Sequence, residues 1–201
     1  MPSMSLTQKL TEALDSGVNQ IGQIRILQNP LRLHHLDDSD LESLQIHTDP
    51  DDAREISLYS GDGSYRFTKG ELSLKRGWIF QLENIEDLRR TLDLFYPAAL
   101  GLWQATCSGT IRIQNLRDKL NRQTGMYRHA RKVTDKGAQE LVQSICGPSN
   151  QCVKKILWSI DKNLPLEDSE ASRYNGIVGE ASENTAIPMV CQEACNVFVA
   201  A

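Results

Sequence analysis

Four of the five cysteines lie in the last third of the 201-residue chain, in two closely spaced pairs. Cys146 and Cys152 flank a turn-forming Gly-Pro segment, and Cys191 and Cys195 lie four positions apart. Thiolates are soft ligands that select iron–sulfur clusters, zinc or copper(I) over hard cations. Two pairs supply the four ligands that a cubane cluster or a structural zinc ion requires. The spacing therefore predicts a metal centre held by these four cysteines.

The spacing within each pair favours an iron–sulfur cluster, specifically [4Fe–4S], over zinc. Structural zinc sites usually leave two to four residues between paired ligands. Cys191 and Cys195 satisfy that rule, but Cys146 and Cys152 are farther apart and enclose Gly147-Pro148. Bound zinc and metal-free packing of the cysteines stand as alternatives. The fifth cysteine, Cys107, lies far upstream, shortly before a predicted strand over 110–113. We expect it to be structural, with a role as a replacement ligand as the alternative.

Local sequence patterns suggest how the cysteines are positioned. Residues 135–146 and 153–160 carry apolar residues at helical spacing, which predicts a helical hairpin with Cys146 and Cys152 at its turn. Asp135 is the expected cap of the first of these helices. Because residues four apart lie on the same face of a helix, Cys191 and Cys195 are expected on one helical face.

The first half of the chain reads as a separate α+β unit. A capping box at Ser5 predicts a helix after it, and Asn84 is expected to cap another helix that Pro97 interrupts. Alternating or short apolar runs predict strands at 24–27, 72–74 and 78–82 and a hairpin over 56–67. The predicted fold is thus α+β, with a small mixed α/β domain over 1–105 followed by a mostly helical, cysteine-ligated iron–sulfur domain over 106–201.

Composition narrows the functional class. No apolar run reaches 18 residues, and the N-terminus lacks the basic and apolar regions of a signal peptide, so we expect a cytoplasmic protein without membrane spans. An odd number of cysteines in such a protein argues against a disulfide framework. No Ser/His/Asp or paired-carboxylate arrangement stands out, and we do not expect an enzyme acting on its own.

Several segments resemble one known family. The cysteine-containing and preceding basic segments resemble the [4Fe–4S]-binding module that follows the chelatase domain in long sirohydrochlorin cobaltochelatases. Two upstream segments resemble the small stabilising domain that precedes this module in the same proteins. The segments are Leu120–Arg128, Cys146, Cys152–Trp158 and Cys191–Asn196 for the module, and Phe67–Trp78 and Asp93–Leu100 for the stabilising domain.

The resemblance implies that Cys146, Cys152, Cys191 and Cys195 ligate a [4Fe–4S] cluster. It also implies that metal insertion belongs to a chelatase domain, which this sequence does not contain, so the module is not expected to be a chelatase. The expected function is electron transfer or redox sensing. An accessory role that binds tetrapyrroles of the sirohydrochlorin or cobalamin type, and a structural zinc protein, are the alternatives.

Charge is unevenly distributed, although the formal total is only −4. One segment, Arg112–Lys136, combines eight basic residues with two acidic ones. Such a surface attracts anionic partners, and we expect it to meet an acidic redox protein or an anionic tetrapyrrole. Nucleic acid is an unlikely partner because the overall charge is negative and no recognition motif is present. The candidate partner-binding residues are Arg112, Arg117, Lys119, Arg122, Arg128, Arg131 and Lys132.

Overall fold

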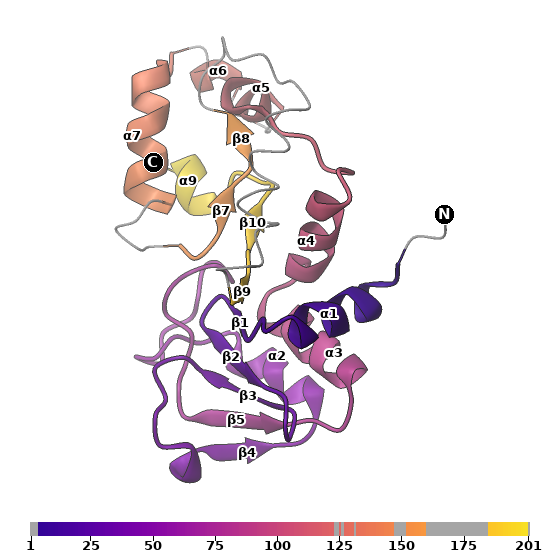
Figure 1. Ribbon diagram of the computed structural model, residues 1–201. Helices are drawn as coiled ribbons and strands as arrows, with labels where there is room; N and C mark the ends of the chain where they lie inside the picture. Colours follow the sequence, from indigo (N-terminus) through magenta and orange to yellow (C-terminus); the bar gives the residue numbers. More distant parts are fainter. Residues whose placement is uncertain are drawn as a thin grey trace.

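The structure is a computed structural model that describes residues 4–122, 125, 127–130, 132–146, 152–159 and 185–200. The described residues form two lobes joined by the helix α4 and by strand β9 (Figure 1). The first lobe holds a six-stranded sheet and helices α1 to α4, and the second holds the cysteine segments. Arg131 lies outside the described residues.

The sheet of the first lobe has the strand order β4-β5-β3-β2-β1-β9. Strands β1, β2, β3 and β5 pair antiparallel in that spatial succession, whereas the outer strands β4 and β9 pair parallel to their neighbours. The sheet therefore contains β9, so a segment from near the end of the chain completes the sheet of the first lobe. The bounds are β1 Gln20–Ile21, β2 Ile24–Leu27, β3 Arg32–His35, β4 Gln45–His47, β5 Trp78–Gln81 and β9 Ala186–Ile187.

The helices of the first lobe begin where the sequence predicts caps. The Ser5 hydroxyl accepts the backbone N–H of Gln8, and the Gln8 side chain accepts the N–H of Ser5, which completes the capping box. The Asn84 side chain accepts two backbone N–H groups in the same way. The helices are α1 Leu6–Asp15, η1 Leu41–Ser43, η2 Pro50–Asp52, α2 Ala53–Ile56, α3 Ile85–Phe95 and α4 Ala99–Cys107.

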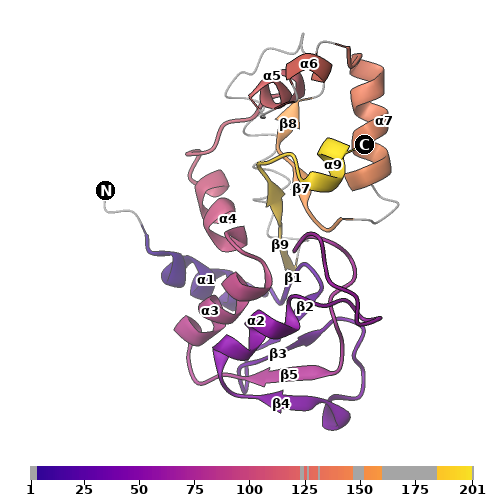
Figure 2. The ribbon, with the colours of Figure 1, turned by 180° about the vertical axis from the view of Figure 1, so that it is seen from behind.

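Helix α3 packs its apolar face against the sheet. The Phe95 ring stacks on Trp78 with centroids 4.7 Å apart and meets the edge of Phe80 at 5.8 Å. Leu88 and Leu92 on the same face are fully buried. Burying each such side chain stabilises the fold by about 1.5–3 kcal/mol. The sheet and α3 therefore form the packed core of the first lobe, and loops of this lobe extend toward the second (Figure 2).

The predicted hairpin over 56–67 is only partly formed. Residues 53–56 are helical, and the chain beyond them makes isolated bridges, Tyr59 to Tyr65 and Ser60 to Leu74, without a continuous ladder. The side chain of Asp62 accepts hydrogen bonds from Ser60 and Ser64 and closes the turn. Backbone bonds from Arg66 to Leu58 and from Ser60 to Ser64 pair the two arms over a short length, and the side chain of Asp62 adds to the turn. The predicted strand at 72–74 is reduced to the bridge at Leu74.

The second lobe contains short parallel strand pairs as well as helices. Strand β10 pairs with β7, and β6 pairs with β8. Its elements are β6 Gln114–Asn115, α5 Leu116–Asn121, α6 Tyr127–Ala130, α7 Asp135–Cys146, β7 Lys155–Ile156, β8 Trp158–Ser159, β10 Val190–Cys191 and α9 Asn196–Ala200. Mixed helices and sheets make the described chain α+β, as expected from the sequence. No helix among the described residues is both long and apolar enough to cross a membrane.

Two local predictions in this lobe are wrong. The segment that follows Cys152 forms strands β7 and β8 instead of a helix, because its backbone pairs with β10 and β6. The apolar residues Ile156 and Leu157 fit either a helix or a strand, so pairing with strands from elsewhere in the chain determines which element forms. The strand predicted over 110–113 is absent from the described structure, and strand pairing begins at Gln114.

Candidate metal centre

Cys146, Cys152, Cys191 and Cys195 line a single cavity of about 290 Å³. They come from three separate segments of the second lobe: the end of α7, the segment before β7, and the β10–α9 turn. All four are partly buried and none forms a disulfide. The structure thus brings together the four thiols that the sequence singles out.

Cys146 is held by the helix that it terminates. Helix α7 begins after Thr134, whose hydroxyl accepts the backbone N–H of Gly137, so Thr134 acts as the cap that was expected at Asp135. Ala138 and Ile145 are buried in the core of the second lobe, on the same helix. The packing of α7 therefore fixes the position of its last residue.

Cys191 and Cys195 do not share a helix face, which corrects the expectation from their spacing. Cys191 ends strand β10, where it pairs with Ile156 of β7. Cys195 precedes α9, and its sulfur accepts the backbone N–H of Phe198 at 3.4 Å. The parallel strand pair and the start of the helix place the two thiols around the cavity.

Cys152 is held partly by the first lobe. It forms an isolated bridge with Glu71, and the next residue, Val153, donates its backbone N–H to the Gly70 carbonyl at 2.7 Å. The Cys152 sulfur also accepts the N–H of Lys154 at 3.4 Å. The loop of residues 68–73, hereafter the covering loop, thereby packs against the cysteine site. Thr68 of this loop lines the four-cysteine cavity itself.

The electrostatics of the site suit a cationic occupant. Burial, together with the nearby Cys152, Cys191 and Cys195, raises the pKa of Cys146 to about 12. Burial also raises the pKa of Cys152 and Cys191, although the Lys154 ammonium opposes that shift. Four thiolates cannot gather here without compensating positive charge, and coordination to a metal removes thiol protons outright. The donor set and its cavity fit an iron–sulfur cluster.

The four cysteines lie on the wall of one cavity. Within the described ranges, no three His, Cys, Asp or Glu side chains are arranged to hold a single metal ion. A [4Fe–4S] cluster is held by four cysteine thiolates around a multi-atom core. The distribution of Cys146, Cys152, Cys191 and Cys195 around a cavity agrees with that requirement.

Sequence reasoning missed two contributors to the site. Lys154 lines the four-cysteine cavity and is the cation that acts on both Cys152 and Cys191. In the sequence, the only indication of this role is that Lys154 lies two residues after Cys152, a predicted ligand. The covering loop was also missed, because its contact with Cys152 spans the two lobes.

The predicted partner-binding residues lie elsewhere. Of those that the structure describes, which excludes Arg131, none lines the cavities next to the cysteines. Helices α5 and α6, which carry several of them, lie at the end of the second lobe remote from the sheet (Figures 1 and 2). Among those that make contacts within the chain, Arg117 donates to the Val133 carbonyl at 2.6 Å, and Arg122 donates to the Gln114 side chain at 3.2 Å.

Cys107 lies apart from the four cysteines. It is the last residue of α4 and packs against the core of the first lobe. It is not among the residues that line the four-cysteine cavity. Its position agrees with the structural role expected from its place in the sequence.

Comparison with known proteins divides the chain between two family models. Residues 8–107 match the DR2241 stabilising domain, and residues 108–201 match a 4Fe-4S iron-sulfur cluster binding domain. No curated protein matches the sequence.

A solved structure with a similar fold is DR2241 from Deinococcus radiodurans, described as a multi-domain protein with structural similarity to chelatases and two additional novel domains. The two chains share 20% identity with a TM-score of 0.67. The match covers 98% of this chain but 40% of DR2241, so this chain spans less than half the length of that protein.

Proposed function

Because this chain belongs to the family that joins a DR2241 stabilising domain to a 4Fe-4S iron-sulfur cluster binding domain, we propose that it is an electron-transfer or redox-sensing protein. Cys146, Cys152, Cys191 and Cys195 are its cluster ligands. The observation that carries the proposal is that these four thiols, from three segments, line one cavity. When bound, a cluster of this kind supplies reversible electron exchange at a potential set by its surroundings.

The chain's own residues shape those surroundings. Lys154 supplies a positive charge beside Cys152 and Cys191, and the N–H groups of Lys154 and Phe198 donate to two of the sulfurs. Hydrogen bonds to sulfur and nearby charge are the means by which proteins tune cluster potentials. The covering loop limits solvent access from the side of the first lobe.

An acidic redox protein is the partner that the charge distribution favours. Exposed basic side chains steer the encounter with an acidic surface, even where they lie away from the site of electron exchange. Arg112, Arg128 and Lys132 are exposed on the second lobe. Association is expected to weaken as salt rises, because exposed charges are screened over about 10 Å at 0.1 M ionic strength.

The cluster and its redox activity are tested together. Anaerobically purified protein is expected to contain about four iron and four sulfide per chain, to absorb broadly near 400 nm, and to give a reversible wave in voltammetry. Iron, sulfide and zinc analysis of the same sample checks the composition. Tightly bound zinc without labile sulfide would contradict the cluster, and a loaded but redox-silent cluster would contradict electron transfer.

A second candidate function is an accessory role in tetrapyrrole metabolism. The observations that favour it are the likeness to DR2241, whose description notes structural similarity to chelatases, and the basic segment Arg112–Lys136. An anionic macrocycle such as sirohydrochlorin would meet that basic segment. Titration with sirohydrochlorin and voltammetry on the same preparation separate the two functions, since saturable binding without a redox wave favours the accessory role.

A further inference from the structure

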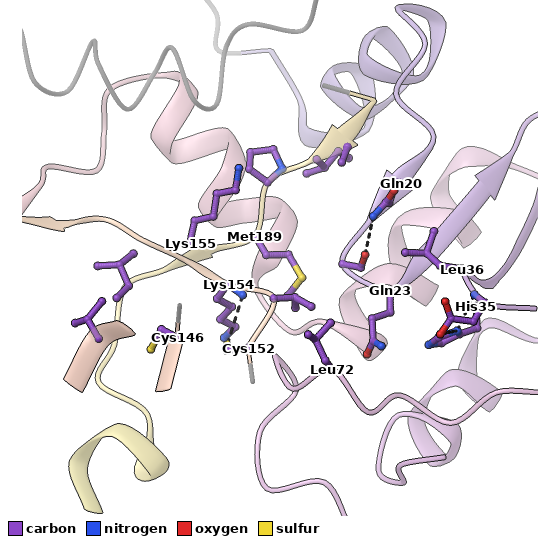
Figure 3. A pocket seen from close by; sticks show the side chains of 18 residues that line it. Gln20, Gln23, His35, Leu36, Leu72, Cys146, Cys152, Lys154, Lys155 and Met189 are labelled. Carbon is purple, nitrogen blue, oxygen red and sulfur yellow. Dashed lines mark hydrogen bonds and ion pairs between the residues drawn. The ribbon is translucent and has the colours of Figure 1, made fainter. Parts of the chain in front are cut away.

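A larger cleft, of about 700 Å³, lies between the two lobes on the other side of Cys146 and Cys152. Gln20, Gln23 and His35 of the first lobe stand opposite the two cysteines and Lys155 of the second lobe (Figure 3). The volume falls within the range of small-molecule sites, which are typically 300–1,000 Å³. The proposed function makes no use of this cleft.

The two lysines that line the cleft form no ion pair with a carboxylate among the described residues, although Lys154 also lies beside the thiols of Cys152 and Cys191. Neither Lys154 nor Lys155 takes part in an ion pair within the part of the chain that the structure describes. Lys154 is partly buried and Lys155, in β7, is exposed. Two adjacent ammonium groups at the wall of one cleft favour a negatively charged ligand.

The opposite wall offers further hydrogen-bond donors. The Gln23 carbonyl oxygen Oε1 accepts the Leu74 backbone N–H at 3.1 Å, and its amide NH₂ group has no acceptor among the described residues. Gln23 is 8% exposed. An amide whose oxygen is already occupied presents its N–H groups to whatever enters the cleft.

His35 is a buried, neutral part of this wall. Its Nδ1 accepts the backbone N–H of Asp37 at 3.1 Å, so the proton of the neutral ring is on Nε2. Burial lowers the pKa of His35, which favours that neutral form. The residue is 1% exposed, and its Nε2 is buried from solvent without a hydrogen-bond acceptor in the described structure. His35 therefore forms a neutral part of the wall and does not offer a hydrogen bond to a ligand in the cleft.

The remaining lining is largely apolar. Leu72, Ile187 and Met189 lie between the donor groups. The one acidic side chain of the lining, Asp37, is 57% exposed and forms an ion pair with Arg76 at 3.1 Å. The cleft therefore combines unpartnered donors and positive charge with apolar walls.

We propose that this cleft binds a carboxylate-bearing organic molecule with an apolar body, through Lys154 and Lys155 on one wall and the Gln23 amide on the other. Its binding site borders Cys146 and Cys152, so ligand and cluster would be close neighbours. The proposal goes beyond electron transfer and does not depend on it, because binding requires neither a redox-active cluster nor a protein partner.

The test uses the full chain carrying its cluster and the fluorescent probe 1-pyrenebutyrate, with uncharged 1-pyrenebutanol as the matched probe. Saturable binding of the carboxylate, with pyrene emission quenched by the adjacent cluster, is expected. Pyrenebutanol is expected to bind at least about tenfold more weakly, as loss of a charged hydrogen-bond partner costs about 1.5–3 kcal/mol. Equal affinity for the two probes would overturn the proposal.

Three variants locate the site. Lys155→Gln removes a charge, and Gln23→Glu keeps the acceptor for Leu74 but replaces the free donor with a carboxylate. Each is expected to weaken pyrenebutyrate binding about tenfold. Lys75→Gln, at an exposed lysine of the first lobe that does not line the cleft, serves as the control and should leave the affinity unchanged.

Absorbance near 400 nm and circular dichroism establish that each variant is folded and loaded. If folded Lys155→Gln and Gln23→Glu bound pyrenebutyrate with wild-type affinity, the proposal would be wrong. So would a matching loss in Phe67→Ser, since Phe67 is 83% exposed on the surface and is not part of the cleft lining. Voltammetry of the same samples reports on electron transfer separately.

Discussion

The carbonyl of Gly70 accepts the backbone N–H of Val153 at 2.7 Å, and this hydrogen bond joins the first lobe to the residue that follows Cys152. A Cβ atom on residue 70 would lie 3.2 Å from the Cys152 sulfur and 3.1 Å from the Lys154 side chain. The covering loop and the cysteine segment are thus in van der Waals contact, with no room for a side chain between them. The first lobe therefore contributes directly to the geometry of the metal centre.

Replacing Gly70 with Val is expected to displace Cys152 and to lower cluster occupancy, because the added methyl groups need space that the two segments fill. Iron and sulfide per chain after anaerobic reconstitution measure the effect. Gly61→Val is the matched control, since a Cβ there meets no atom within 4 Å. Full cluster occupancy in Gly70→Val would show that the covering loop does not constrain the site.

Arg66 is expected to hold the covering loop in place. The residue is 3% exposed, and its guanidinium donates to the carbonyls of Ser57, Lys69 and Glu71. Arg66→Met should lower the free energy of unfolding by about 2–4 kcal/mol, because buried carbonyls lose charge-assisted partners. Urea denaturation measures the loss, and Arg54→Met, at an exposed arginine of α2, is the control. A change below about 0.5 kcal/mol would contradict this role.

Serine substitutions are expected to distinguish the four predicted ligands from the fifth cysteine, Cys107. Cys146→Ser and Cys195→Ser are expected to lose or degrade the cluster, since a serine oxygen is a harder and poorer ligand than a thiolate. Cys107→Ser should retain the iron and sulfide content of the wild type, as Cys107 packs in the first lobe. Absorbance and electron paramagnetic resonance compare the three. Loss of the cluster in Cys107→Ser alone would require a different ligand set.

Lys69 gives the first lobe a pH-dependent stability. Burial, together with Arg66, lowers the pKa of Lys69 from 10.5 to about 8. Between these values the unfolded chain binds a proton that the folded chain does not, so the contribution of this residue to the free energy of unfolding increases as pH rises from 8 to 10.5. Denaturation of wild type and Lys69→Met across this range isolates the effect, which should be absent in the variant.

An exposed lysine of the same lobe, Lys75, supplies the control for that series. Lys75→Met is expected to keep the wild-type dependence on pH. Parallel stability curves for wild type and Lys69→Met would show that Lys69 is not the source of the dependence.

Lys154 is expected to raise the reduction potential of the cluster. Its ammonium faces Cys152 and Cys191, and a nearby positive charge stabilises the more negative reduced state. Lys154→Gln should therefore lower the potential, by on the order of 50 mV for about 1 kcal/mol of lost stabilisation. Voltammetry of the loaded variant measures the shift, with Lys136→Gln as the distant control. An unchanged or higher potential in Lys154→Gln would be inconsistent with this placement of charge.

The sequence by itself determined the features that depend on near neighbours. The caps at Ser5 and Asn84 and the apolar stripe of α3 specify helices through contacts a few residues apart. Paired cysteines likewise indicate a thiolate metal centre, because ligand chemistry depends on residue type more than on fold. The overall α+β class followed from the same local signals.

Tertiary structure decided the features that depend on distant partners. Residues after Cys152 form strands because β10 and β6 provide hydrogen-bonding edges from elsewhere in the chain, although their apolar pattern also fits a helix. The contact of Gly70 with Cys152, the position of Lys154 beside two thiols and the cleft lined by Gln23 all require two lobes to meet. Local periodicity carries no information about such contacts, since strand pairing and lobe packing are fixed by the energy of the whole fold.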